Sequence, residues 1–409
     1  MSGIMNNYFY GKAGQADYTV EQMPTNRKQL FFTTLKVRFS SMVGINLLHF
    51  VFMLPLLLWL FLGYQALNIY AGLDVYDAPE VREQLREVAP EIVSKYEAFE
   101  ALDAEFSSLV SKYGSAEKID ALFEAGEKVI LDKTDETGNT VQDREIAQDY
   151  WNDQLKTARA EHYRDYANGL IQQRNGNIVT TLLIAVPLFA IASLGRPGMM
   201  YVLRNWARDE HSFVWQDYKD AIKANWKQSL PLGLLNGLSF LLFFVAWTFY
   251  GEQANSNWIF AILQGLMLVI LIVWWMMNEV IYVMMVTYDM KLFTLIRNSI
   301  LMVIARLPIA FLILLGTVAF PLLLMFVPAP YNLLALLLVY LFIGFAFVGF
   351  VQASFANSCF DKYLNPRIEG AEVNKGLYNP DEDEKAAEAE DTPKELVKED
   401  RYWEHKTRK

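Results

Sequence analysis

Six apolar segments alternate with polar stretches along the chain. An α-helix needs about 20 consecutive apolar residues to cross the hydrocarbon of a bilayer. The segments that approach this length are Met42–Leu67, Ile178–Leu194, Leu230–Phe249, Trp258–Tyr288, Ile309–Phe326 and Leu333–Phe355. The pattern therefore predicts an all-α, polytopic membrane protein with six transmembrane helices in a lipid bilayer.

Lysine and arginine are distributed unevenly over the segments that connect these spans. Cytoplasmic loops carry an excess of the two residues. The loops Gly251–Asn257 and Val327–Asn332 have none. Three other segments have several, namely Arg27, Lys28, Lys36 and Arg38, then Arg196, Arg204, Arg208, Lys219, Lys223 and Lys227, and finally Lys291, Arg297 and Arg306. This distribution predicts that both termini are cytoplasmic and that the long segment between spans one and two is outside.

These spans and loops divide the chain into five parts. Residues 1–41 form a cytoplasmic N-terminal segment with an interfacial helix, residues 42–73 the first transmembrane helix, residues 74–173 an extracytoplasmic helical insert, residues 174–360 transmembrane helices two to six with cytoplasmic amphipathic connections, and residues 361–409 a cytoplasmic charged tail. The tail contains the acidic run Asp381–Glu384 and few apolar residues. This composition favours disorder.

The outer insert has a heptad-like pattern of apolar residues, which predicts helices that pack as in a coiled coil. The two apolar seams are Val81, Leu85, Val88, Ile92, Tyr96, Phe99, Leu102, Phe106, Leu109 and Tyr113, and then Ile146, Tyr150, Leu155, Ala158, His162, Tyr166 and Leu170. We expect an antiparallel hairpin with a capping box at Asp77–Glu80, a kink or restart at Pro90, a short helix around Ile119–Leu131 and a turn at Thr137–Asn139. Such a hairpin is either a solvated spacer or a docking surface for an outer partner.

Composition and motifs exclude several classes of function. Of the 409 residues, 53% are hydrophobic and 20% are charged, and the net charge of −10 includes no basic stripe, so we expect no nucleic-acid partner. The single cysteine, Cys359, and four scattered histidines do not have the spacing of a metal site. No phosphate-binding loop, dinucleotide fingerprint or nucleophile elbow is present. We therefore predict a non-enzymatic protein without catalytic residues, metal or cofactor. The first apolar run starts after about forty residues, too late for a signal peptide.

Polar residues within the spans are the candidates for a binding site, because ionisable groups in a bilayer are costly and often functional. Glu279 and Asn278 lie in span four, and His49 and Asn46 lie early in span one. The four could line a polar path for a proton or a solute. Alternatively, Glu279 extends to the interface or pairs with Arg297, and His49 makes an interhelical hydrogen bond.

Span three carries a helix-packing motif. Gly233 and Gly237 form a GxxxG pattern, with Asn236 on the same turn, and such spacing lets two helix backbones approach closely. The motif serves either internal packing or a seam between copies, so a homo-oligomer stays possible. The segments Leu30–Phe39 and Tyr201–Lys227 mix apolar and basic residues, which predicts interfacial helices or a cytoplasmic partner site. Residues 195–198 are interpreted as a turn that leaves span two.

Three stretches resemble a known family when they are taken together and in order. They are Arg38–Pro55 (RFSSMVGINLLHFVFMLP), the run YVLRNWARDEHSFVWQDYKDAIKANWKQSL within Gly198–Leu230, and Tyr288–Pro308 (YDMKLFTLIRNSILMVIARLP). They resemble the YesL-like family of bacterial membrane proteins, whose molecular function is unknown. The resemblance implies the plasma membrane of a Gram-positive bacterium. It also implies an association with carbohydrate uptake, because such proteins are typically encoded near sugar-uptake systems. The long outer insert and the acidic tail are additions to the family pattern.

Two functions are compatible with these observations. The first is an accessory or regulatory membrane protein that contacts carbohydrate transporter or signalling subunits through the hairpin and the two amphipathic segments. The second is a small secondary transporter or channel with a polar path near Glu279. A transporter often has repeated halves or broken helices, and the sequence shows no clear internal repeat.

Overall fold

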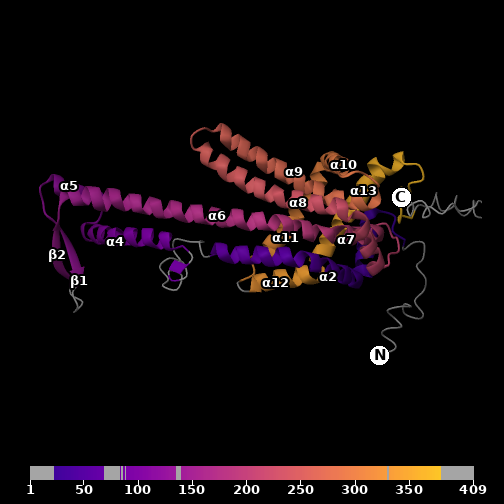
Figure 1. Cartoon of the computed structure of the whole chain (residues 1–409), viewed down its shortest axis with the longest axis horizontal. Coiled ribbons are helices and arrows are strands. Elements are labelled where there is room, and N and C mark those ends of the chain that lie inside the picture. Colours follow the sequence, from indigo (N-terminus) through magenta and orange to yellow (C-terminus); the bar gives the residue numbers. More distant parts are fainter. Residues whose placement is uncertain are drawn as a thin grey trace, which may run out of the picture. The chain divides into compact units, whose positions relative to one another are not determined.

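A computed structural model describes residues 23–68, 83, 86–87, 89–134, 140–328 and 331–378 of the chain. Its elements are α2 (Arg27–Asn68), α4 (Pro90–Tyr113), α5 (Ala116–Glu124), β1 (Val129–Thr134), β2 (Thr140–Ile146), the π-helix η3 (Tyr150–Ala158), α6 (Arg159–Leu194), α7 (Arg196–Trp206), α8 (Val214–Ala254), α9 (Ile259–Thr287), α10 (Leu292–Ala305), α11 (Leu307–Leu324), α12 (Tyr331–Val339), the π-helix η4 (Tyr340–Gly344), α13 (Phe345–Tyr363) and the 3₁₀ turn η5 (Asn365–Arg367) (Figure 1).

Six helical segments among the described residues are long and apolar enough to cross a membrane, as the sequence predicts. They are Arg27–Leu67, Tyr150–Leu194, Val214–Ala254, Ile259–Thr287, Leu307–Leu324 and Tyr331–Arg367. Several run beyond the predicted spans. The amphipathic segment Leu30–Phe39 is the first part of α2, and Tyr201–Lys227 is divided between α7 and the start of α8. The chain is therefore a mostly helical, multi-pass membrane protein.

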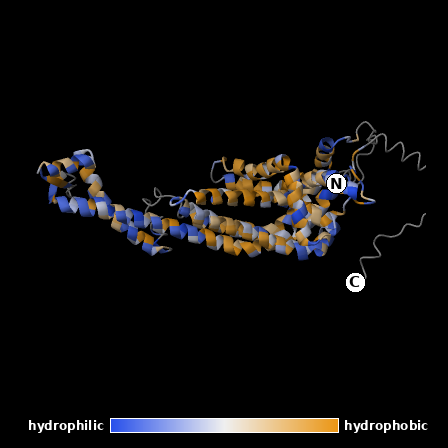
Figure 2. Cartoon of the chain, turned by 90° about the horizontal axis from the view of Figure 1, so that it is seen from above, coloured by the Kyte–Doolittle hydropathy of each residue, from blue (hydrophilic) through white to orange (hydrophobic). Residues whose placement is uncertain are grey.

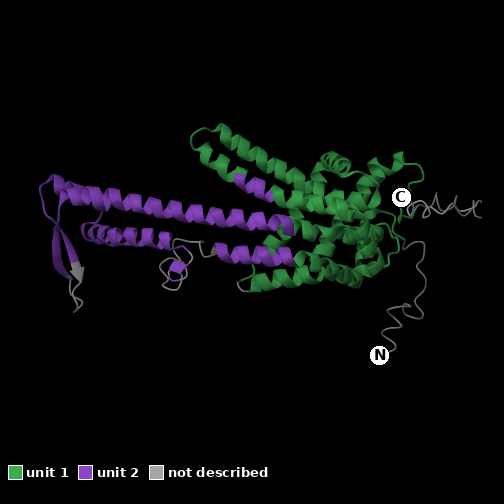
Figure 3. Cartoon of the chain, viewed as in Figure 1, with its two compact units in different colours: residues 1–54, 189–239, 246–409 green, residues 55–188, 240–245 purple. Residues whose placement is uncertain are grey.

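The chain forms two compact units, which we describe separately (Figure 3). Unit 1 comprises residues 1–54, 189–239 and 246–409. At its centre is the second half of α9, where every residue from Met276 to Met285 is buried. The helices α7, α10, α11 and α13 contact α9. A helix segment that is apolar on nearly all sides has to be covered by other helices or by lipid chains, and the second half of α9 is covered by helices.

The first half of α9 differs from the second in its surroundings. Ile262, Leu266 and Val269 are each more than half exposed, and Leu312 and Leu323 of α11 are exposed to a similar degree. Figure 2 shows the helices of the bundle mostly in the colour of hydrophobic residues. In water such surfaces would be unfavourable, whereas in a bilayer they contact lipid chains of the same polarity.

Unit 2 comprises residues 55–188 and 240–245 and contains a long helical pair. We call residues 89–101 and 159–170 the stalk, and the described residues between 102 and 158 the head. In the stalk, Ile92, Val93 and Tyr96 of α4 pack with Tyr166 of α6. The π-helix η3 and α6 continue into span two as one segment of 45 residues, about 68 Å at 1.5 Å per residue. About 30 Å of it suffices for the hydrocarbon, so this segment is about twice as long as a span requires.

The head has a hydrophobic core of its own. Leu109, Ile119, Val129, Leu131, Ile146, Trp151 and Leu155 are buried together. Phe106 stacks on Trp151 with ring centroids 5.3 Å apart and the rings 2° from parallel. The side chain of Ser115 accepts a hydrogen bond from the backbone of Lys118 and so caps the start of α5.

A two-stranded antiparallel sheet in the head corrects part of the prediction. The predicted helix Ile119–Leu131 ends at Glu124, and Val129–Leu131 pairs with β2 instead. Gly126, at φ +72°, reverses the chain after the helix, and the β-branched residues that follow favour a strand. Ile146, predicted in the second helical seam, ends β2. These strands are an exception to the all-α prediction within a mostly helical fold.

Pro90 behaves as the sequence predicts. It is the first residue of α4, where its missing N–H has no helical partner to lose. The predicted capping box at Asp77–Glu80 and the turn at Thr137–Asn139 lie outside the described residues, as do the acidic run Asp381–Glu384 and the rest of the tail after residue 378.

Candidate functional site

Unit 1 contains a group of buried polar side chains between α2, α7, α8, α9 and α13. Asn46, His49, Asn236, Asn278, Glu279 and Gln352 are each at most 6% exposed. A buried polar group is unfavourable unless it is hydrogen-bonded. Their bonding partners therefore separate the side chains that stabilise the fold from those that are open to a ligand.

Asn46 has a structural role. Its Nδ2 donates to the carbonyl oxygens of Tyr340 at 2.8 Å and Leu341 at 2.7 Å, and its Oδ1 accepts from the backbone of Ala346 at 2.9 Å. The carbonyls lie in η4, where the widened turn between α12 and α13 breaks the regular backbone ladder. Asn46 replaces the hydrogen bonds that a π-turn leaves unmade. Both N–H groups of the amide and one acceptor site of its oxygen are therefore used within the fold.

Asn278 is also satisfied within the bundle. Asn236 and Asn278 exchange two amide hydrogen bonds, at 2.9 and 3.1 Å, and Trp274 Nε1 donates to Asn236 Oδ1 at 3.0 Å. These bonds join α8 to α9. A fully paired polar group in a membrane bundle holds its helices in one register.

The GxxxG motif lies where α8 meets the end of α6. A Cβ atom at Gly233 would clash with Ser193 Oγ and would come within 2.7 Å of the Phe189 carbonyl oxygen. Beside it, Ser193 Oγ donates to the carbonyl of Ser229 at 2.8 Å, and Ser229 Oγ donates back to the carbonyl of Ser193. Gly237 is buried as well. Gly233 therefore serves a close approach of helices within the chain.

Glu279 is different, because it is 2% exposed and neither carboxylate oxygen has a hydrogen-bonding partner among the described residues. The ion pair with Arg297 that the sequence suggested does not form. Arg297 is exposed on α10 and pairs with no carboxylate in the described part of the chain. Glu279 does not reach the interface either, since it belongs to the buried half of α9.

His49 is fully buried, and both ring nitrogens are without a hydrogen-bonding partner in the described part of the chain. Among these residues no hydrogen bond of normal geometry forms, but the Gly195 backbone lies close enough to interact with the ring, so the interhelical hydrogen bond stays a prediction. The ring contacts Phe345 edge-on, with centroids 5.6 Å apart. It also lies against the turn after span two, since a Cβ atom at Gly195 would come within 2.9 Å of His49 Nδ1. The glycine thus allows the imidazole to approach the backbone.

Arg196, which the sequence analysis assigned only to a turn, adds a charge to this region. Its Nη2 donates to Gln352 Oε1 at 3.0 Å, and its guanidinium carbon lies 4.9 Å from the centre of the Tyr282 ring. Its Nε has no partner among the described residues. Burial lowers the pKa of Arg196. A signal was present in the sequence, because this arginine directly follows a span between two glycines.

The four residues proposed to line a polar path differ in their bonding partners. Asn46 and Asn278 are saturated by separate hydrogen bonds, whereas His49 faces the turn at Gly195. No hydrogen bond or ion pair joins Glu279 to the other three within the described ranges. Of the side chains described above, Glu279, His49 and Arg196 have polar atoms without a hydrogen bond of normal geometry among the described residues.

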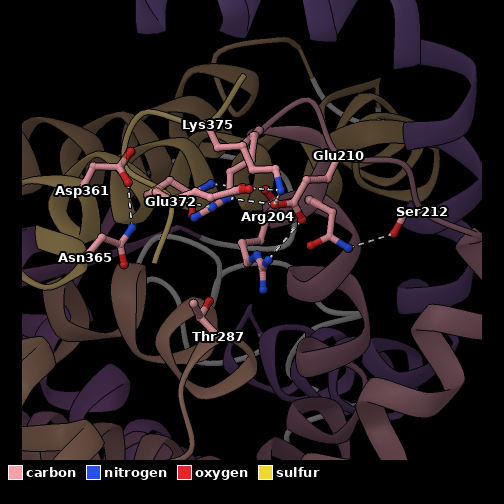
Figure 4. A network of polar contacts seen from close by, with 12 residues as sticks. Arg204, Glu210, Ser212, Thr287, Asp361, Asn365, Glu372 and Lys375 are labelled. Atoms are coloured by element: carbon pink, nitrogen blue, oxygen red, sulfur yellow. Dashed lines mark hydrogen bonds and ion pairs between the residues drawn. The ribbon is translucent and has the colours of Figure 1, made fainter. Parts of the chain in front are cut away.

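A second polar network lies at the end of unit 1 where α7 and α13 end (Figure 4). The carboxylate of Glu210 forms ion pairs with Arg204 at 3.2 Å, with Arg208 at 3.0 Å and with Lys375 at 3.5 Å. Burial lowers the pKa of Arg204. The hydrogen bond from Lys375 lowers the pKa of Glu372. Most of these charges are paired, so the network favours a structural role.

The same network fixes residues 361–378, which the charge pattern placed in the tail. Asp361 pairs with Arg27 and accepts a 2.7 Å hydrogen bond from Asn365. Tyr288 donates to Asn365 at 2.6 Å, and burial raises the pKa of Tyr288 to about 12. Gly376, at φ +82°, passes so close to Arg208 that a Cβ atom would come within 2.6 Å of its carbonyl oxygen. Ion pairs hold this segment where local composition predicted a free tail.

Residues 177–247 match the family model described as DUF624, protein of unknown function. This is the YesL-like family of membrane proteins. The resemblance inferred from the sequence motifs is thereby confirmed over these residues, which include the second of the three motifs. No curated protein and no solved structure matches the chain.

The DUF624 match covers the end of α6, all of α7 and most of α8. It therefore contains Arg196, Glu210, Gly233 and Asn236, whereas His49 and Glu279 lie outside it. Within the described residues, no group of three His, Cys, Asp or Glu side chains could hold a metal ion. Unit 1 also has a cleft of about 460 Å³ between the start of α2 and residues 376–378, lined by Leu30, Thr33, Thr34 and Arg38 among others.

Proposed function

We propose that this protein is a non-enzymatic accessory protein of a bacterial plasma membrane that presents its head to a protein partner on the outer side. The observation that carries the proposal is the independent core of the head, in which seven apolar residues are buried at the far end of a stalk. A spacer needs only a paired seam, as in the stalk. A small folded body with its own core offers a defined surface instead.

The surface of the head supports a docking role. Charged pairs surround the core, including Arg144 with Glu105 at 2.5 Å, Lys156 with Asp120 at 2.9 Å and Arg159 with Asp103 at 2.6 Å. Such pairs contribute little free energy when exposed but keep side chains in one arrangement. Beside them Val141 of β2 is 45% exposed. A rigid polar surface with an apolar residue is suited to recognising a protein.

The orientation and the link to carbohydrate uptake rest on separate grounds. The lysine and arginine distribution supports cytoplasmic termini and an outer head. The resemblance to the YesL-like family supports a Gram-positive plasma membrane and a partner among carbohydrate transporter or signalling subunits. We propose both as parts of the same function.

The test is affinity purification of the full chain from native membranes in mild detergent, followed by mass spectrometry. In one variant a short Gly-Ser linker replaces residues 104–158. The 2.6 Å ion pair between Asp103 and Arg159 shows that these two chain positions are close enough for such a linker. We expect transporter or signalling subunits with the wild type and their loss with this variant. An unchanged set of partners would contradict the proposal.

A point substitution sharpens the test without removing the head. Val141→Glu places a charge on the exposed apolar residue, whereas Gln142→Glu places the same charge on the opposite face of β2, because successive strand residues point to opposite sides. We expect the first to weaken partner recovery at least fivefold and the second to leave it unchanged. Equal partner recovery with both variants would show that β2 is not part of the docking surface.

A second function, transport of a proton or small solute, is supported by one observation: Glu279 and His49 are buried without partners. Intramembrane groups of this kind are typical of coupling sites. Solute uptake by proteoliposomes would test it, with sugars and with a proton gradient. We expect Glu279→Gln to abolish uptake and Glu369→Gln, an exposed carboxylate on the segment after α13, to leave it unchanged. Equal uptake by both variants would exclude Glu279 from transport.

A further inference from the structure

Arg196 is a positive charge without a carboxylate partner inside unit 1. In the described ranges its side chain makes one hydrogen bond, to the neutral Gln352, and one contact with the face of Tyr282. Arginine keeps its charge under nearly all conditions and has five N–H donors in a planar fork. A cation without a counter-charge beside it is unfavourable in a largely apolar bundle, and its buried Nε has no partner among the described residues. A compensating anion would remove much of that cost.

The groups around Arg196 come from three other helices. His49 of α2 lies against Gly195, the residue before Arg196, and is close enough for the charge of Arg196 to act on its ring. Both its nitrogens are buried, and in the part of the chain that the structure describes neither makes a hydrogen bond of normal geometry, the Gly195 backbone being the polar group nearest to the ring in the contacts above. Tyr282 of α9 and Gln352 of α13 hold the guanidinium from two other sides. The arginine is thus fixed in place while donors on it and beside it stay unused.

The acid in the same bundle does not supply the missing charge. Glu279 lies one turn before Tyr282 on α9, yet no ion pair joins it to Arg196 among the described residues, and neither of its oxygens is bonded. By contrast, Arg204 and Arg208, which follow Arg196 on or just after α7, both pair with Glu210. Of these three arginines, Arg196 alone lacks a carboxylate partner among the described residues.

We propose that Arg196 and His49 form a binding site for a phosphate group. The planar fork of arginine matches the geometry of phosphate oxygens and forms charge-assisted hydrogen bonds to them. His49 supplies a further donor from α2, and Gln352 keeps the fork oriented. Arg196 is partly exposed, so the group can reach it without unfolding the bundle. The phosphate belongs either to a lipid headgroup or to a free phosphorylated solute. The site is independent of the docking function proposed for the head.

The test uses the full chain in a nonionic detergent after exhaustive washing to remove lipid. Isothermal titration calorimetry measures binding of inorganic phosphate in one arm and of dihexanoylphosphatidylglycerol in the other, both at constant ionic strength set by sodium chloride. We expect saturable binding in at least one arm. Binding of the short-chain lipid alone assigns the site to a headgroup, and binding of inorganic phosphate assigns it to a free phosphate group.

Variants connect the binding to the proposed residues. We expect Arg196→Gln to lower the affinity at least tenfold and His49→Gln to lower it severalfold. Arg196→Lys, which keeps the charge but not the fork, should fall between wild type and Arg196→Gln. Arg297→Gln removes an exposed positive charge and should change nothing. If Arg196→Gln does not fold, the Arg196→Lys and His49→Gln variants still decide the matter. Absence of saturable binding in both arms, or equal affinity in wild type and the folded site variants, would overturn the proposal.

Discussion

The head of unit 2 and the helical bundle of unit 1 distribute polar and apolar side chains in opposite ways. In the head, apolar residues such as Leu109 and Trp151 are buried and charged pairs lie around them. In the bundle, leucines and isoleucines of α9 and α11 are exposed, whereas Asn46, His49 and Glu279 are buried. The same amino acids take opposite positions because water surrounds one region and lipid chains the other.

This difference indicates which interactions stabilise each region. The head depends on apolar burial, which favours folding only in water. The bundle gains little from moving leucine out of lipid, so close packing and interhelical hydrogen bonds carry more of its stability. Substitutions that remove apolar volume should therefore act most strongly on the head, and substitutions that remove hydrogen bonds should act on the bundle.

The largest effect is expected for Trp151→Ala. The side chain is fully buried, stacks on Phe106 and donates to Asp120 at 2.7 Å. Removing it should destabilise the head by about 3–5 kcal/mol. Hydrogen exchange of the full chain should become faster in residues 102–158 and stay unchanged in unit 1. Val141→Ala, at an exposed position, serves as the control, and unchanged exchange in the head would refute the idea of an independent core.

Asn46→Ala should be the most damaging substitution in the bundle that removes only polar atoms. It removes three hydrogen bonds and leaves the carbonyls of η4 unsatisfied. We expect a loss of about 1–3 kcal/mol, seen as a lower midpoint of thermal unfolding in detergent. Leu47→Ala, at the next and exposed position of α2, should have a smaller effect. A larger effect of Leu47→Ala would mean that apolar burial also dominates the bundle.

Asp120→Asn should destabilise the head by about 1 kcal/mol, because a neutral acceptor replaces a charged one for Trp151 Nε1. Hydrogen bonds from Trp151 and then from Lys156 lower the pKa of Asp120 below 3.8. The folded state therefore binds this proton less readily than the unfolded state. The stabilisation is present above the ordinary aspartate pKa and is lost as pH falls through the lowered value.

Hydrogen exchange in the head at neutral and acidic pH would measure this effect. In the wild type, the amides of the head should lose part of their protection against exchange at acidic pH. In Asp120→Asn, the protection should be lower at neutral pH and should decrease less on acidification. Glu124→Gln, at an exposed position near the end of α5, is the matched control. The same pH response in wild type and Asp120→Asn would show that another group is responsible.

The smallest effect on stability is expected for Glu279→Gln. No described hydrogen bond or ion pair is lost, and a buried group that can carry a charge is replaced by a neutral one of the same shape. The free energy of unfolding, measured by thermal unfolding in detergent, should decrease by less than about 0.5 kcal/mol or should increase. A loss of 2 kcal/mol or more would reveal an interaction of Glu279 that the isolated chain does not show.

The spans and the stalk could be predicted because their signals are local. Six runs of apolar residues and the seam with Ile92, Tyr96 and Tyr166 are readable from spacing alone, and Pro90 marks the start of α4. The β-hairpin of the head was missed. Its residues follow a helical seam in sequence, and only the turn at Gly126 and the pairing of Val129 with Ile146 separate them from a helix.

The candidate site required tertiary structure. The sequence identified Asn46, His49, Asn278 and Glu279 as candidates, with Glu279 first, since each is a polar residue within a span. Hydrogen bonds with η4 and its flank satisfy Asn46, and hydrogen bonds with Asn236 satisfy Asn278. Glu279 and His49 make no hydrogen bond of normal geometry among the described residues. Arg196 looked like one of many cytoplasmic positive charges until α13 and α9 placed Gln352 and Tyr282 beside it.

The sequence by itself determined the number of spans, the solvent that each region requires and the presence of the stalk, because hydropathy and periodicity depend only on neighbouring residues. Only the tertiary structure decided which buried polar groups are bonded, that the head has a core of its own and that residues 361–378 are held at the end of the bundle. A hydrogen bond or an ion pair depends on the partner that folding brings within about 3 Å, and no local pattern encodes the identity of that partner.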